Sequence, residues 1–280
     1  MSSSPAHQPT PMPAQLTLLA TSFYLLTIYL LVRPVGVPTN KAPHLPLLTI
    51  ALWAVSLTLH AATLNQSLLT ESGLDLSFFN ALSLVGWLVA TLLFATTLRQ
   101  PLESLAIVLL PLIIIILLTG LMAPVLNQQI IVEGMGLKMH ILGSLLAFSI
   151  LSLAAAQALI LSYQDYHLRN HQLTGWVRHL PPLQYMESFL FQLIWLGFFL
   201  LSAALVSGWM FLDDIFAQHL LHKTVLSFLA WVLFAMLLMG RLLAGWRGRK
   251  AIHWTLGGFA LLVLAYFGSK MVLEIILLKP

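Results

Sequence analysis

Histidine is the side chain in this 280-residue sequence that is best suited to bind a metal, because the chain contains ten histidines and no cysteine. A neutral imidazole coordinates iron, zinc or copper, whereas thiolate ligation is impossible here. The missing cysteines also exclude a disulfide framework and the covalent attachment of haem through a CxxCH motif. Metal or haem chemistry would therefore depend on histidines, and their positions decide which are candidates.

Three histidines lie toward the same predicted side of three different apolar segments. His60 lies about five residues inside its segment, which places it about 7 Å below the membrane boundary. His140 and His222 each begin a segment, next to Lys138 and Lys223. An ionisable side chain within a membrane is costly and is by default a functional candidate. The alternative is that His60 hydrogen-bonds a neighbouring helix and that the other two are ordinary interfacial residues.

The other histidines are weaker candidates. His167 and His171 are spaced i, i+4 and could hold a divalent metal on a helix, but the sequence specifies no third ligand. His219 and His222 lie near two aspartates and could form a metal site with them. The same residues also fit a solvated turn. The sequence has no GxSxG, HExxH, GxxxxGK[ST] or GxGxxG motif, so hydrolysis and nucleotide chemistry are disfavoured and we expect no enzyme.

The segments that must position these residues are strongly apolar. Hydrophobic residues make up 59% of the chain and charged residues only 8%, whereas a soluble domain is about 25% charged. The composition predicts an all-α, polytopic membrane helix bundle, in which a tail over residues 1–14 precedes a single domain over residues 15–280. We place eight spans at residues 15–32, 45–65, 77–98, 104–123, 140–163, 187–211, 224–243 and 254–276.

Basic residues predict the orientation of the bundle. Nine of the thirteen lysines and arginines fall in the odd-numbered connections between spans, so we expect that end to face the cytoplasm and both termini to lie outside. The net charge of +4 is too small and too dispersed for a nucleic-acid partner. Most of the eight tryptophans lie near predicted span ends, where they fit an aromatic belt or a stacking surface for a flat ligand.

Several segments resemble a known family. The chain is similar to the cytochrome c assembly family of integral membrane proteins, of the CcsA and CcmC type, and most of all to its small YpjD-type and HemX-type branch. The similar segments are MHILGSLLAFSILSLAAAQAL, PPLQYMESFLFQLIWLGFFLLSAALVSGWMF, HKTVLSFLAW and GWRGRKAIHWTLGGFALLVLAYFGSK. The resemblance covers nearly the whole chain and is weakest before Pro43, and it implies a multi-pass protein of the bacterial inner membrane.

The resemblance also implies haem handling. His60 and His140 match family histidines and are the implied axial ligands of a non-covalent, b-type haem, with His222 as a reserve ligand. The family's tryptophan-rich WWD segment is missing between Gly208 and Trp231, so we expect no catalysis of thioether formation. The implied partners are haem, the lipid bilayer and a cytochrome c maturation protein or another membrane protein. The alternatives are a multi-span permease, or a scaffold that stabilises another membrane or haem-synthesis protein.

Overall fold

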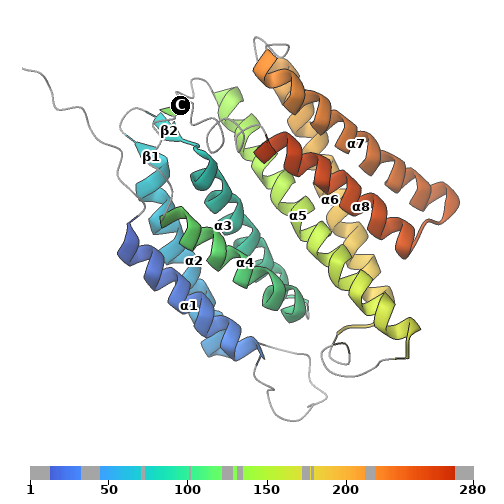
Figure 1. Ribbon diagram of the computed structural model, residues 1–280, viewed down its shortest axis with the longest axis horizontal. Coiled ribbons are helices and arrows are strands. Elements are labelled where there is room, and N and C mark those ends of the chain that lie inside the picture. The colour runs from blue at the N-terminus through green and yellow to red at the C-terminus, as the bar shows by residue number, and fades with distance from the viewer. Residues whose placement is uncertain are drawn as a thin grey trace, which may run out of the picture.

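The computed structural model describes residues 13–32, 45–70, 73–100, 102–121, 129–130, 135–171, 177, 180–211 and 218–268. Within these residues it contains eight helices that are long and apolar enough to cross a membrane, which confirms the all-α, eight-span prediction (Figure 1). Nearly all of the predicted tail lies outside the described residues, as does the end of the predicted last span.

Observed helix boundaries agree with the predicted spans within a few residues in the first half of the chain, whereas the helices of the second half begin four to six residues earlier than predicted. The helices are α1 (Ala14–Val32), α2 (Leu47–Leu68), α3 (Phe78–Thr97), α4 (Glu103–Leu121), α5 (Met135–Arg169), α6 (Leu183–Phe211), α7 (Gln218–Ala244) and α8 (Arg249–Val263). A short π-helix, η2 (Leu264–Gly268), continues α8. Helix α5 is longer than predicted at both ends because its polar final turns keep helical hydrogen bonds beyond the apolar span.

The eight helices form two four-helix bundles (Figure 1). In the first bundle α1 packs against α2 and α4, and α3 packs against the same two helices. The second bundle repeats this cyclic order, because α5 packs against α6 and α8, and α7 packs against the same two helices. Helix α5 joins the bundles through its contacts with α3 and α4. The fold thus repeats an arrangement for which the sequence shows no internal repeat.

The two ends of the bundle differ in character. Three short antiparallel strands, β1 (Leu69–Thr70), β2 (Gly73–Asp75) and β3 (Gln129–Ile130), form a small sheet where α2 ends and α3 begins (Figure 1). We call this the sheet end, and it is the predicted outer side. We call the other the arginine end, because α5 and α7 finish there with Arg169 and Arg241 in their last turns.

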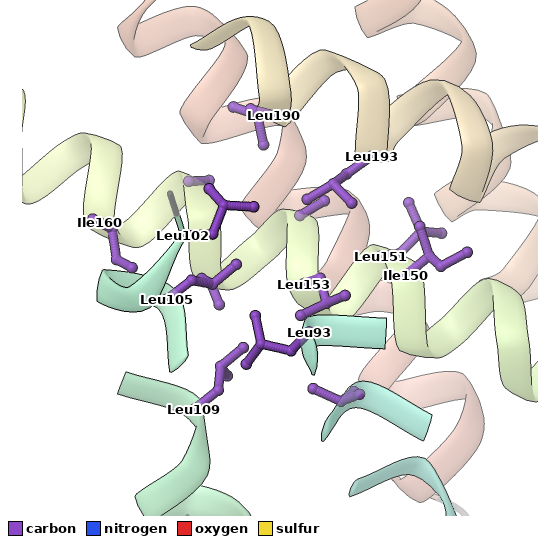
Figure 2. Close-up of a cluster of buried hydrophobic side chains, with 14 of the residues drawn as sticks. Leu93, Leu102, Leu105, Leu109, Ile150, Leu151, Leu153, Ile160, Leu190 and Leu193 are labelled. Carbon is purple, nitrogen blue, oxygen red and sulfur yellow. The ribbon is translucent and has the colours of Figure 1, made fainter. Parts of the chain in front are cut away.

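An apolar seam holds the bundles together. Leu93, Leu102, Leu105 and Leu109 of the first bundle face α5 and α6, which contribute Ile150, Leu151, Leu153, Ile160, Leu190 and Leu193 (Figure 2). Lipid tails are as apolar as leucine, so close van der Waals packing stabilises such a seam more than water exclusion does. The buried run from Ala154 to Ala156 gives α5 small side chains that allow neighbouring helices to approach, which explains the central place of this helix.

Candidate functional site

His60 lies in the middle of the first bundle and is completely buried. The Tyr24 hydroxyl of α1 lies 3.3 Å from its Nδ1, and the Ser83 hydroxyl of α3 lies 3.1 Å from its Nε2. Helix α2 continues to Leu68, eight residues beyond His60 (68 − 60), so the imidazole lies about 12 Å from the helix end. The predicted depth of about 7 Å was counted from a span end at residue 65, and the observed helix continues three residues further (68 − 65).

Both ring nitrogens of His60 have hydrogen-bonding partners. A neutral imidazole has one N–H donor and one acceptor nitrogen, and each hydroxyl can fill either role. Two arrangements satisfy the chain: Tyr24 donates to Nδ1 while Nε2–H donates to Ser83, or both directions are reversed. The free-energy cost of burying a polar ring is offset by these two bonds. A metal at His60 would have to displace one of the two hydroxyls.

His140 lies in the second bundle, where α5 meets α6 at the sheet end. It was predicted to begin its span, but α5 begins at Met135, so the half-buried imidazole lies just inside the second turn of the helix. Its Nδ1 lies 3.0 Å from the Ser207 hydroxyl. The ring also contacts the backbone at Gly208, where a Cβ atom would stand only 2.9 Å from His140 Cε1. Glycine therefore allows α6 to approach the imidazole.

The hydrogen bonds of Ser207 favour one tautomer of His140. A serine hydroxyl has one hydrogen, and the Ser207 hydroxyl lies 3.0 Å from the Ala204 carbonyl, to which it can donate. In that arrangement Nδ1–H of His140 donates to the serine oxygen and Nε2 carries the lone pair. The backbone of Ala204 also hydrogen-bonds the His140 ring. Metal-ligating histidines generally donate their other N–H in this way, so His140 has the protonation pattern of a ligand.

A tyrosine near His140 was missed in the sequence analysis. The π-helix η2 directs Tyr266 toward α5, where its hydroxyl meets the side chain of Ser144, one helical turn from His140. The Tyr266 ring packs against Phe148 with 5.0 Å between centroids, and Phe267 packs against Phe148 at 5.4 Å. Short π-helices often occur at functional sites. A tyrosine within an apolar span was the available sequence signal, because its hydroxyl requires a partner there.

The described contacts place His60 and His140 in different bundles and do not join them. Helix α5 turns Ile141 toward Leu64 and Trp87 of the first bundle, whereas His140 contacts α6. His222, the predicted reserve ligand, is exposed near the start of α7. No group of three potential metal-ligating side chains occurs among the described residues. The pairing of His60 with His140 on one iron stays a prediction.

The other predicted positions lie apart from this region. His167 is half-buried and its Nδ1 contacts the Tyr163 carbonyl, while His171 follows the end of α5 with a positive φ of 53°, so the two do not share one regular helix face. His7, His44, His179, Asp213 and Asp214 lie outside the described residues. Trp53 is completely buried and packs edge-on against Phe94, so it does not belong to the predicted aromatic belt.

Comparisons with known proteins point in one direction. The model of a family described as cytochrome C assembly protein matches residues 48–277. The chain is 32% identical over 228 residues to the inner membrane protein YpjD of Escherichia coli (strain K12), which covers 79% of this chain and 85% of that protein. It is also 30% identical over 146 residues to an uncharacterized 28.8 kDa protein in the nifR3-like 5' region of Azospirillum brasilense, covering 51% of this chain and 54% of that protein. No solved structure matches significantly.

Proposed function

Because the chain belongs to the cytochrome c assembly protein family, we propose that this multi-pass inner-membrane protein binds haem non-covalently and handles it during cytochrome c biogenesis. The observation that carries the proposal is the contact of His140 Nδ1 with Ser207, which favours the tautomer whose Nε2 carries the lone pair. A histidine nitrogen is a common axial ligand of haem iron. Bound haem would supply a redox-active iron with exchangeable axial positions.

The residues around His140 fit a haem ligand better than those around His60. The imidazole of His140 is half-buried near one end of the membrane span, so it lies at a level that a molecule can reach from the membrane surface. The aromatic rings of Phe148 and Phe267 lie in the same half of the second bundle. Haem presents a broad apolar face, which such side chains favour. We therefore assign His140 as the primary ligand.

The second ligand in this proposal is His60, as the family resemblance implies. Its ligation requires a change in the first bundle, because Tyr24 and Ser83 occupy both of its nitrogens. Such a ligand suits a carrier that receives and releases haem. The hydroxyl group that moves away when iron binds stays nearby, so it can hydrogen-bond the imidazole again when the iron leaves. His222 is the reserve ligand, since it is exposed at the same end of the bundle. We propose no catalysis of thioether formation.

The test is the absorption spectrum of purified protein after reconstitution with haem. The wild-type protein should show a Soret band, and His140→Ala should abolish or shift it. His167→Ala is the matched control, because this histidine is also half-buried and lies on the same helix at the arginine end. His140→Met separates ligation from simple cavity formation, because a thioether still coordinates iron and raises the reduction potential.

The outcomes distinguish the versions of the proposal. An unchanged Soret band in His140→Ala would overturn the assignment of the primary ligand. An unchanged band in His60→Ala alone would leave His140 as ligand and remove the bis-histidine pair. A wild-type protein that binds no haem would overturn haem handling altogether, and substrate flux in vesicles or a stable co-purifying protein would then support a permease or a scaffold.

A further inference from the structure

Basic side chains outnumber acidic ones at the arginine end of the second bundle. Among the described residues, five cations and two carboxylates lie on the last turns of α5 and α7, the start of α6, the α7–α8 turn and the first turn of α8, which gives a net charge of +3 (5 − 2). We call this group the arginine cluster, and its members are Arg169, Arg241, Arg247, Arg249, Lys250, Asp165 and Glu187.

One carboxylate of the cluster is buried and pairs with two arginines of the protein. Glu187 Oε1 accepts hydrogen bonds from Arg241 Nη1 and Arg247 Nε, both at 2.9 Å, and its side chain is only 7% exposed. Arg241 also donates to the Trp246 carbonyl at 3.2 Å and lies 4.4 Å above the Phe191 ring. This half of the cluster fixes the α7–α8 turn against α6, and Arg247 still exposes 54% of its side chain.

The other carboxylate is shared by two arginines and does not balance the remaining charge. Asp165 accepts two hydrogen bonds from Arg169 Nε, at 3.0 and 2.9 Å, and forms a longer ion pair with Arg249, whose Nε lies 3.7 Å from Oδ2. Arg249 is 66% exposed, and Lys250 is exposed with its Nζ 5.7 Å from the Trp246 ring centroid. Both cations lie in the first turn of α8, which contains no acidic residue and where the helix dipole is also positive. One shared carboxylate leaves a net positive charge here, and an anion bound from outside would reduce the repulsion between these cations.

Aromatic and aliphatic side chains beside these cations indicate what kind of anion this is. Trp246 and Trp254 pack with their centroids 5.2 Å apart, in the position that tryptophan favours at a membrane surface. Gly240 has no Cβ, which lets the Trp246 ring contact the backbone of α7. Leu242 and Leu243 in the last turn of α7 are 68% and 81% exposed. Helices α7 and α8 lie on the side of the molecule remote from the first bundle, where lipid can reach them (Figure 1).

We propose that the arginine cluster binds the headgroup of an anionic phospholipid in the leaflet at the arginine end. Arg249, Lys250 and the exposed part of Arg247 contact the phosphate, and the tryptophan pair and the two leucines contact the glycerol and the upper acyl chains. The combination of exposed cations, in excess over the carboxylates, with exposed apolar side chains at the same end of the bundle favours a lipid over a soluble anion or an acidic protein. In this proposal the basic residues at the arginine end form a lipid-binding site, in addition to their effect on the orientation of the protein in the membrane.

The test measures lipid binding to the full-length protein in detergent by native mass spectrometry, with phosphatidylglycerol as the probe and phosphatidylcholine as the neutral lipid. The wild-type protein should retain phosphatidylglycerol preferentially. A cation near an anionic lipid contributes about 1 kcal/mol, which is about fivefold in affinity. The double variant Arg249→Gln/Lys250→Gln should therefore bind phosphatidylglycerol about thirtyfold more weakly, and Lys250→Gln alone about fivefold more weakly.

The matched control is Arg99→Gln/Lys138→Gln, which removes the same two charges from exposed positions outside the cluster. Equal loss in the control and in the cluster variant would overturn the proposal, because binding would then follow overall charge. Equal retention of the two lipids by the wild-type protein would also overturn it. If inorganic phosphate displaces the lipid at millimolar concentration and binds equally well, the occupant is a soluble anion and the lipid assignment is wrong. The single Lys250 variant decides the question if the double variant fails to fold.

Discussion

The buried carboxylate of Glu187 allows a sharp prediction about what stabilises the second bundle. It is the shared acceptor for Arg241 at the end of α7 and for Arg247 in the following turn, so a single oxygen connects three segments. Glu187→Gln preserves the size of the side chain and one acceptor oxygen but removes the negative charge. The two arginines then face each other without compensation, and we expect the free energy of unfolding to fall.

The expected decrease in the free energy of unfolding can be estimated from the exposure of the paired side chains. Breaking a buried ion pair from one side costs about 3–5 kcal/mol, whereas an exposed pair contributes about 0–1 kcal/mol. Glu187 is 7% exposed, Arg241 28% and Arg247 54%, so the site lies between these limits. We expect a loss of about 2–3 kcal/mol, which corresponds to a decrease in Tm of about 4–12 °C for a chain of this size. Most of the loss should come from the pair with Arg241, because Arg247 is largely screened by solvent.

The assay is thermal unfolding of the purified protein in one detergent, compared with Asp165→Asn as control. Asp165 pairs with Arg169, whose side chain is 61% exposed, so its replacement should cost less than about 1 kcal/mol. Arg241→Gln should reproduce most of the effect of Glu187→Gln, and the double variant should show that the two effects are not additive. Equal decreases in Tm for Glu187→Gln and Asp165→Asn would refute the reasoning, because burial would then not control the cost.

Two further predictions concern orientation and the His140 site. A cysteine at position 248 should be protected from a membrane-impermeant maleimide in intact cells while a cysteine at Ser77 is labelled, because the arginine end is predicted to face the cytoplasm; the opposite labelling pattern would reverse the orientation. Gly208→Ala should lower stability by about 1–3 kcal/mol in thermal unfolding, because the new methyl group stands 2.9 Å from His140 Cε1. Gly143→Ala has open space at its Cβ and should not lower the Tm, and equal effects would argue against this close contact.

The number of helices was readable from the sequence, but their mutual arrangement was not. Each span shows itself as a run of about 20 apolar residues. Such a run is apolar on every side, so it does not reveal which face meets lipid and which meets protein. The central role of α5 had a partial signal in its small residues Ala154 to Ala156, since small side chains mark close helix packing. The cyclic order of the helices in the two bundles depends on packing between helices. The pattern of residues in a single sequence does not show which helices pack against each other.

The candidate site was predictable in its residue types but not in the partners of its side chains. His60 was identified because an imidazole inside a span is rare and costly, and His140 because it was expected at the outer end of another span. Their separation into two bundles depends on helix rotation, where neighbouring residues point about 100° apart. The sequence order of His140 and Ile141 therefore does not show that the first contacts α6 and the second contacts the first bundle.

The two embedded histidines differ in chemistry because of a single hydroxyl hydrogen. When the Ser207 hydroxyl donates to the Ala204 carbonyl, it accepts from His140 Nδ1–H, and the opposite ring nitrogen carries the lone pair. Ser83 has no such carbonyl acceptor among the described contacts, so it can donate to His60 as well as accept from it. His60 is therefore satisfied in either tautomer, whereas the contacts of His140 favour the tautomer whose lone pair lies on Nε2. A ligand that enters at the sheet end meets a prepared nitrogen at His140 and must compete with a hydroxyl at His60.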